Sequence, residues 1–302
     1  AYGAQDIYLT GNPQITFFKV VYRRHTNFAM ESVEQTLNGS VSASSKVTST
    51  ISRNGDLVGR IYLEVDTGTI AKHNYGHSMI DNVTCEIGGQ EIDKHYGHWM
   101  ETWAELTEPN PTGLVPEFAA PQASGTKFQR MSGMGGVSDA TAAAGRWNIP
   151  LQFWFCRNPG LALPLIALQY HEVKVILNHL FVDTMDDGTL TANNLWCDYI
   201  YLDTDERRRF AQVSHEYLIE QVQEQSLATS GTNLDLNFNH PVKELIWVGA
   251  AGTTGRVSAS LARPADVGTS YHLKLNGHDR FAARDSRYFS RTQIWQHHTG
   301  SG

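Results

Sequence analysis

The histidines of this chain come nearest to a chemically active pattern. His73 and His77 are four residues apart, and this spacing on a helix can direct two imidazoles at one metal ion. Their segment, KHNYGHS, carries the glycine and asparagine typical of a loop and lacks the glutamate of an HExxH motif. His95 and His98 are close in sequence, yet the chain has no HxH pair of the kind that jelly-roll metalloenzymes place on a strand. We therefore expect no metal site.

Searches for other catalytic motifs also predict no active site. The segment DTMDDGT groups Asp183, Asp186 and Asp187, but a calcium loop needs more alternating oxygen ligands and a closing glutamate. An exposed hairpin turn is the better interpretation. The phosphate-binding patterns GxxxxGK and GxGxxG and the nucleophile pattern GxSxG do not occur in the sequence. We expect no catalytic residue and no cofactor.

A few polar residues are candidates for contact or modification. Arg23, Arg24 and His25 form a basic cluster that either contacts another subunit, where arginine is favoured for its bidentate pairing, or ends a strand in solvent. A second cluster, ERRR at 206–209, is better interpreted as a solvated helix face. Asn38 in NGS and Asn82 in NVT match the glycosylation acceptor pattern, although such triplets are common by chance.

The composition is that of a globular protein without a nucleic-acid-binding surface. The 302 residues are 41% hydrophobic and 18% charged, which suits one large or two medium domains. The net charge of −7 argues against a direct, nonspecific nucleic-acid binder, because such a protein needs a basic surface. The three cysteines lie in apolar stretches without metal-ligand spacing (Cys85, Cys156 and Cys197). They are expected to be reduced core thiols of a protein that folds in the cytoplasm.

The most apolar stretch, 149–177, is predicted to form strands and not a membrane helix. A membrane helix needs about 20 consecutive apolar residues. Here Arg157 and Asn158 interrupt the run, and three prolines would break a helix. The RNPG segment favours a turn between an aromatic piece, LQFWFC, and a second piece that ends in alternation. We predict two buried strands, with His171, Val173, Val175 and Leu177 on one face of the second.

Strand-like segments dominate the rest of the chain and predict an all-β fold. Alternation or turn signals mark segments at 15–24, 59–66, 82–87, 194–203 and 234–238. Gly88-Gly89 is a hairpin signal after the third of these. Many short strands separated by turn residues indicate a β-sandwich or barrel.

Helices are few, and they help to divide the chain. Residues 95–106 space aromatic residues on one helical stripe, and a second helix begins after Asp203, which can cap it together with Glu206. Residues 107–146 are rich in small and polar residues and are expected to form a long exposed loop. A weak repeat links 85–100 with 273–289, since each reads as strand, glycine turn and aromatic helical turn. This favours two sandwiches in tandem.

Several long blocks resemble one protein family. They are GNPQITFFKVVYRRHTNFA (11–29), IGGQEIDKHYGHWM (87–100), FWFCRNPGLALPLIALQYHEVKV (153–175), DYIYLDTDERRRFAQVSHEYLIEQVQ (198–223) and LNGHDRF (275–281). Together they resemble the major capsid proteins of the nucleocytoplasmic large DNA viruses, nearest to the algal-virus and giant-virus branch. The resemblance spans nearly the whole chain.

The resemblance implies a structural role and a specific assembly. Members of the family fold as two tandem jelly-roll β-sandwiches, and three copies form a pseudo-hexagonal homotrimer. The capsomers tile an icosahedral shell over an internal membrane, with minor capsid proteins as partners. It implies a first jelly-roll domain at 1–205 and, at 206–302, a helical linker with the N-terminal part of a second. The protein would be a virion component made in the host cytoplasm, with no enzyme activity and no contact with nucleic acid.

Two further expectations concern the second sandwich and the alternative functions. Far fewer residues follow the glycine turn in the second copy of the repeat than in the first. This comparison predicts that the second jelly roll is truncated in this chain, and that on the order of 100 further residues would complete it. A cupin-like metalloenzyme is disfavoured by the missing HxH pair. A jelly-roll carbohydrate-binding module would use exposed tryptophans as sugar platforms, whereas Trp99, Trp103 and Trp154 lie in apolar contexts that favour burial.

Overall fold

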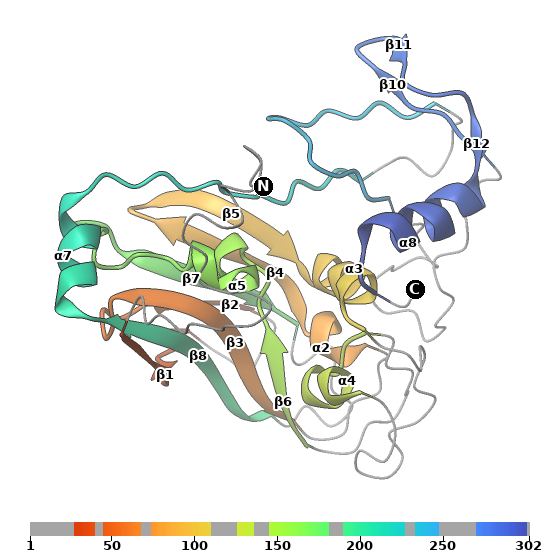
Figure 1. Cartoon of the computed structure of the whole chain (residues 1–302). Coiled ribbons are helices and arrows are strands. Elements are labelled where there is room, and N and C mark those ends of the chain that lie inside the picture. Colours follow the sequence, from red (N-terminus) through yellow and green to blue (C-terminus); the bar gives the residue numbers. More distant parts are fainter. Residues whose placement is uncertain are drawn as a thin grey trace, which may run out of the picture.

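Figure 1 shows the structure of the chain, which is a computed structural model. It describes residues 27–39, 45–67, 74–109, 126–135, 145–180, 190–226, 233–247 and 270–300. Four predictions therefore lie outside the described residues: the strand at 15–24, the basic cluster Arg23–His25, His73 and the turn at 183–189. The predicted loop at 107–146 lies outside them over residues 110–125 and 136–144.

Two four-stranded antiparallel sheets form the larger, first unit of the chain (Figure 1). Their strand orders are β1-β8-β3-β6 and β2-β7-β4-β5. Strands that neighbour each other in space are often distant in sequence, which is the interleaved arrangement of a jelly roll. The predicted sandwich is confirmed for this unit. Its strands are β1 (Phe28–Gln35), β2 (Ser45–Thr50), β3 (Leu57–Thr67), β4 (Ile80–Ile87), β5 (Gln90–Tyr96), β6 (Gly145–Pro150), β7 (Val173–His179) and β8 (Leu190–Leu202).

Alternating apolar side chains fill the space between the two sheets. In β3, Ile61, Leu63 and Val65 are buried, whereas Tyr62 and Glu64 on the opposite face are partly exposed. Strand β7 follows the same pattern in the second sheet, with Val173, Val175 and Leu177 buried. Each buried aliphatic side chain stabilises the fold by roughly 1.5–3 kcal/mol relative to an exposed one. These rows therefore hold the sheets face to face.

The predicted hairpin at Gly88-Gly89 joins β4 to β5. Both glycines have positive φ, at 61° and 84°, as a type I′ turn requires of its two central residues. The turn brings Ile87 opposite Gln90 and fixes the register of the two strands.

The stretch 149–177 departs from its prediction. The piece LQFWFC is not a strand: Trp154–Arg157 form the short helix α5, followed by the 3-10 turn η1 (Pro159–Leu161). The aromatic rings pack on each other instead of lying along a strand, with Phe153 stacked on Phe155 at 5.6 Å. The prolines keep the following chain in turns, so β7 starts only at Val173 and His171 is exposed.

Helices pack at one end of this sandwich. The predicted helix at 95–106 is confirmed as α3 (Gly97–Thr107), and the predicted loop around His77 contains the four-residue helix α2 (Tyr75–Ser78). The prediction of an exposed loop over 107–146 is wrong for residues 126–135. There Thr126 and Gln129 form a capping box that starts helix α4 (Lys127–Ser132), and Met134 is fully buried beyond it.

Gly97 sits where α3 meets the sheet, and it has no room for a side chain. A Cβ at this position would lie 2.2 Å from the His77 carbonyl oxygen and 2.3 Å from that of Ile80. We expect Gly97→Ala to destabilise the fold by about 3 kcal/mol, because two backbone segments must move apart. Gly89→Ala is the control, since Gly89 faces open space and carries only the turn strain of roughly 1 kcal/mol. Urea unfolding midpoints compare the two, and an equal or larger loss for Gly89→Ala contradicts this interpretation.

Helix α7 (Thr204–Gln212) follows the sandwich and leads to a smaller, second unit (Figure 1). As predicted, the Asp203 side chain caps it, accepting from the Thr204 N–H at 2.7 Å, but Glu206 does not complete a capping box. The second unit, described over 214–226, 233–247 and 270–300, is mostly extended chain with short paired strands. These are β9 (Ser270–Tyr271), β10 (Lys274–Leu275), β11 (His278–Asp279) and β12 (Arg284–Asp285), followed by η2 (Tyr288–Gln293) and α8 (Ile294–His297).

The strand predicted at 234–238 is extended but has no ladder partner among the described residues. The side-chain amide of Gln225 takes the place of a partner strand. Its Nε2 donates to the Asp235 carbonyl at 2.7 Å, and its Oε1 accepts from the Asn237 N–H at 2.8 Å. The strand prediction for 234–238 is therefore wrong: the segment forms no strand, and Leu234 and Leu236 of its predicted apolar face are 45% and 38% exposed.

The second unit repeats the local order of the first. Asn276 and Gly277 both have positive φ, as Gly88 and Gly89 do, and they join β10 to β11. An aromatic-bearing helical segment follows in both units. In the second unit Phe289 is its centre, with the rings of Trp247, Tyr271, Phe281 and Tyr288 between 5.1 and 5.7 Å away.

Candidate functional site at the junction of the two units

The histidines have structural partners, and the described part of the chain holds no cluster of three or more potential metal ligands. His77 Nδ1 lies 3.2 Å from Glu101, whose carboxylate also accepts from the Gly135 N–H at 3.0 Å. His95 is fully buried, and burial lowers its pKa to about 3. Its Nε2 accepts from the Gln152 N–H, and its ring packs edge-on against Phe153 at 4.6 Å. These contacts hold neighbouring segments of the first unit together and are structural.

The three cysteines are free and buried, as predicted. Burial is the main cause that raises the pKa of each thiol. A thiol that stays protonated is a poor nucleophile and a poor metal ligand. The cysteines therefore act as apolar core residues.

The two glycosylation candidates lie in different environments. Asn38 is exposed next to Gly39, and its backbone pairs with Thr48. Asn82 is buried in β4, where its Oδ1 accepts from Asn178 Nδ2 at 2.7 Å. A side chain enclosed in a sheet is not presented to an enzyme, so the structure argues against Asn82 as an acceptor.

The most elaborate polar arrangement lies where the second unit meets the first. Residues 217–224 run along β5 and α3 of the first unit. The Val222 N–H donates to Asp93 Oδ1 at 3.2 Å, Gln221 Nε2 donates to the Ile92 carbonyl, and Glu224 lies 3.3 Å from His98 Nε2. We call these contacts, with those of Arg157 described next, the seam.

Arg157 is the centre of the seam. Its side chain is only 14% exposed, and its guanidinium lies 5.1 Å from the centroid of the Trp103 ring. It pairs with Glu220 at 3.3 Å, and Lys243 binds the same carboxylate. The hydrogen bond from Lys243, followed by the charge of Arg157, lowers the pKa of Glu220. Arg157 is the last residue of helix α5. The aromatic segment that the sequence predicted to be a strand is therefore a short helix, and this helix places the Arg157 cation at the junction.

Asp93 is the buried acid of the seam. Its Oδ1 accepts from Val222, but its Oδ2 makes no hydrogen bond with any described residue. Burial raises the pKa of Asp93 to about 6, although Arg157 and the backbone donors oppose this. A buried carboxylate with one unsatisfied oxygen costs folding free energy when it is charged.

A second set of contacts ties the end of the described chain to α3. The Gly300 N–H donates to the Leu106 carbonyl and Thr299 Oγ1 to the Thr107 carbonyl, each at 2.8 Å. His298 pairs with Glu244 and meets the Trp103 ring edge-on, with 6.4 Å between the ring centroids. Trp103 is therefore covered by Arg157 on one side and approached by His298 on another. This environment does not suit a sugar platform. Of the three tryptophans expected to be buried, Trp154 is buried, whereas Trp99 and Trp103 are partly exposed.

This arrangement joins two structural units and has no group placed for chemistry. Sequence analysis did not identify Arg157, Asp93 or Glu220 as important. Two signals were present: a lone arginine inside an apolar stretch, and the alternating EQVQEQ segment at 220–225, whose glutamates pair with Arg157 and His98 of the first unit.

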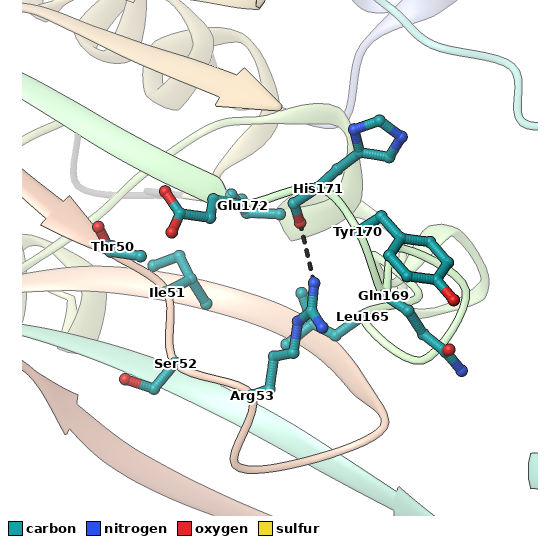
Figure 2. A pocket seen from close by; sticks show the side chains of 10 residues that line it. Thr50, Ile51, Ser52, Arg53, Leu165, Gln169, Tyr170, His171 and Glu172 are labelled. Atoms are coloured by element: carbon teal, nitrogen blue, oxygen red, sulfur yellow. Dashed lines mark hydrogen bonds between the residues drawn. The ribbon is translucent and has the colours of Figure 1, made fainter. Parts of the chain in front are cut away.

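The first unit has an open hollow of about 460 Å³, and none of its lining residues belongs to the seam. Figure 2 shows the side chains that line it. Arg53 reaches across it and donates to the carbonyls of Leu168 and His171, at 2.6 and 3.2 Å. The charged guanidinium group of Arg53 is thus bound by backbone carbonyls of the protein itself. Tyr170 points out of the hollow and is 94% exposed. The lining carries no buried, unpaired polar side chain that would fix a ligand, so we assign it no site.

The exposed arginines of helix α7 agree with the solvated helix face predicted for ERRR at 206–209. Helix α7 exposes its three arginines, and Arg207 pairs with Asp56 at 3.0 Å. No helix in the described ranges is long and apolar enough to cross a membrane.

Comparison with known proteins identifies relatives over nearly the whole chain. A family model described as "Major capsid protein N-terminus" matches residues 16–203, and one described as "Large eukaryotic DNA virus major capsid protein" matches 206–301. The major capsid protein of Pyramimonas orientalis virus is 53% identical, over 99% of this chain and 74% of that protein. That of Paramecium bursaria Chlorella virus 1 is 41% identical, over 98% and 76%.

A solved virus capsid structure is also similar to this chain. The capsid structure titled "PBCV-1 virus capsid, quasi-atomic model" matches with a TM-score of 0.68 and 35% identity, over 93% of this chain and 77% of that one. The family resemblance and the jelly-roll class predicted from sequence are thereby confirmed.

Proposed function

The chain belongs to the major capsid proteins of large eukaryotic DNA viruses, and from this premise we propose that three copies associate into a pseudo-hexagonal capsomer of an icosahedral shell. Its role is that of a structural capsid protein. The observation that carries the proposal is the jelly-roll order of the first unit together with the fold match to a virus capsid structure.

The proposed division of the chain follows from the same observations. Residues 1–205 are the first jelly-roll domain, and 206–302 are a helical linker with part of a second jelly roll. The boundary between the two matching family models and the start of α7 support this division. The repeated glycine turn supports a second unit of the same kind.

The proposed partners are other copies of the chain, neighbouring capsomers and minor capsid proteins. The shell would lie over an internal membrane and form in the host cytoplasm. The acidic balance of the chain supports a position that does not touch nucleic acid. Arg23, Arg24 and His25 stay candidates for a subunit contact, and Asn38 for a glycan.

The alternative functions have less support. An enzyme or a sugar-binding module needs a reactive cluster or an exposed aromatic platform. His77 and His95 are engaged in core contacts, His98 and His298 pair with glutamates, and Trp103 is covered by Arg157. We therefore propose that the chain has no enzyme activity.

The trimer is tested by mass in solution. We expect sedimentation and light scattering of the purified chain to give three times the 33.6 kDa chain mass at micromolar concentration. A stable trimer should bury more than about 1,000 Å² per interface. A monomer at every concentration up to the solubility limit contradicts the proposal.

A further inference from the structure

Three buried polar atoms of the first unit lie beneath the seam without a hydrogen-bond partner among the described residues. They are Asp93 Oδ2, His95 Nδ1 and Arg157 Nε. Asp93 is 2% exposed and His95 is 0% exposed, and the Arg157 side chain is 14% exposed. An unpaired polar atom at this depth costs folding free energy, so native proteins pair nearly all such atoms with protein groups or with ordered water.

The fold brings these three side chains to one place. Asp93 and His95 are alternate residues of β5 and are both buried, so they point to the same face of the sheet. Val222 donates to Asp93 and Glu220 pairs with Arg157, and Cα atoms two residues apart can be separated by at most about 7 Å. The charge of Arg157 lowers the pKa of both Asp93 and His95, which agrees with a guanidinium close to both side chains.

The three atoms form a set of two donors and one acceptor. His95 Nε2 accepts from the Gln152 N–H at 3.4 Å, and burial keeps the imidazole neutral. A neutral imidazole carries one proton, which must then be on Nδ1, so Nδ1 is a donor. Arg157 Nε is a donor as well, while its Nη2 atom pairs with Glu220. Asp93 Oδ2 is the acceptor, because Oδ1 takes the Val222 N–H.

We propose that one buried water molecule binds to Asp93 Oδ2, His95 Nδ1 and Arg157 Nε and is a structural part of the seam. Its oxygen accepts from the two N–H groups, and one of its hydrogens is donated to the carboxylate. Three hydrogen bonds are the usual number for a buried water. A metal ion does not suit this site, because two of the three groups present N–H donors, and an anion would meet the Asp93 carboxylate.

The water connects both units of the chain. Asp93 belongs to β5 and Arg157 to α5, and each of these side chains also holds one residue of segment 220–222. A bridging water is nearly as favourable in enthalpy as a direct hydrogen bond. It therefore fixes the two side chains that bind Val222 and Glu220 in the orientation that the seam needs. This site does not depend on the proposed assembly into trimers.

Arg157→Lys tests the site on the whole chain. Lysine has a methylene group where arginine has Nε, so the variant loses one donor and keeps a cation that can pair with Glu220. In a high-resolution crystal structure of the wild type, we expect a solvent peak within about 3.2 Å of all three atoms. The peak should be lost in Arg157→Lys. Arg146→Lys makes the same chemical change at an exposed pair with Asp66, and it should keep the peak.

Oxygen-17 relaxation dispersion in H₂¹⁷O gives the second readout, because it counts long-lived waters in solution. We expect one fewer such water in Arg157→Lys than in the wild type and in Arg146→Lys. Asp93→Asn is a further variant in case Arg157→Lys does not fold. Its amide presents a third donor to an oxygen with only two lone pairs, so the occupancy of the peak should fall.

Several results would overturn the proposal. One is a wild-type structure in which the three atoms bond directly to one another or to other residues. Another is an anomalous bromide peak at this position after a bromide soak, which would make it an anion site. A solvent peak that is unchanged in Arg157→Lys, or in Asp93→Asn if only that variant folds, would show that these atoms do not hold the water. An equal count of long-lived waters in all variants would contradict the proposal in solution.

Discussion

Replacing Arg157 with methionine is expected to loosen the second unit from the first, at a cost of about 3 kcal/mol. The reason is that methionine fills similar space but leaves the Glu220 carboxylate without its closest cation in the first unit. Removing one partner of a buried ion pair costs roughly 3–5 kcal/mol. We expect the lower end of this range, because the Glu220 side chain is 32% exposed and Lys243 retains part of the compensation. The stacking of the guanidinium on Trp103 is lost as well.

Limited proteolysis and urea unfolding measure this effect. The variant should be cleaved within 214–226 at protease concentrations that leave the wild type intact. Arg146→Met is the control: Arg146 is 58% exposed and pairs with Glu64 and Asp66 on the sheet surface. Such surface pairs contribute about 0–1 kcal/mol. Equal protease sensitivity of the two variants contradicts a central role for Arg157.

The first unit was largely predictable because its strands are buried on one face only. In β3 and β7, period-2 alternation reflects one face turned to the core, so the pattern gives both the strand and the buried residues. The Gly88-Gly89 turn was equally readable, since positive φ at both central positions favours glycine.

The errors came from segments whose apolar residues do not alternate. Residues 151–157 are buried nearly throughout, and continuous burial does not distinguish a strand from a tightly packed helical turn. Helix α4 was missed because it lies within a low-complexity stretch, although the spacing of Thr126 and Gln129 in the sequence fits a capping box. The seam could not be predicted from local patterns, because its partners, such as Asp93 and Val222, are 129 residues apart.

Asp93 has the second large expected effect, and it depends on pH. An aspartate in the unfolded chain has a pKa near 3.9, whereas burial in the seam raises the pKa of Asp93 to about 6. Below about pH 4 the residue is protonated in both states, and its burial costs least. As pH rises through 6, the folded state must hold a charged carboxylate, and stability is lost. The full loss is about 3 kcal/mol, from roughly two pKa units at 1.36 kcal/mol each.

Asp93→Asn should remove this penalty. The amide oxygen can still accept from the Val222 N–H, so we expect the variant to be more stable than the wild type at pH 7.5 by up to about 3 kcal/mol, with the difference vanishing near pH 4. Urea unfolding at pH 4, 5, 6 and 7.5 measures it, with Asp235→Asn, at an exposed position, as the control for a lost charge. Because the charge of Arg157 holds down the pKa of Asp93, Asp93→Asn should stabilise the Arg157→Met background still more at pH 7.5. A gain that is the same at every pH would show that Asp93 acts through packing and not through its charge.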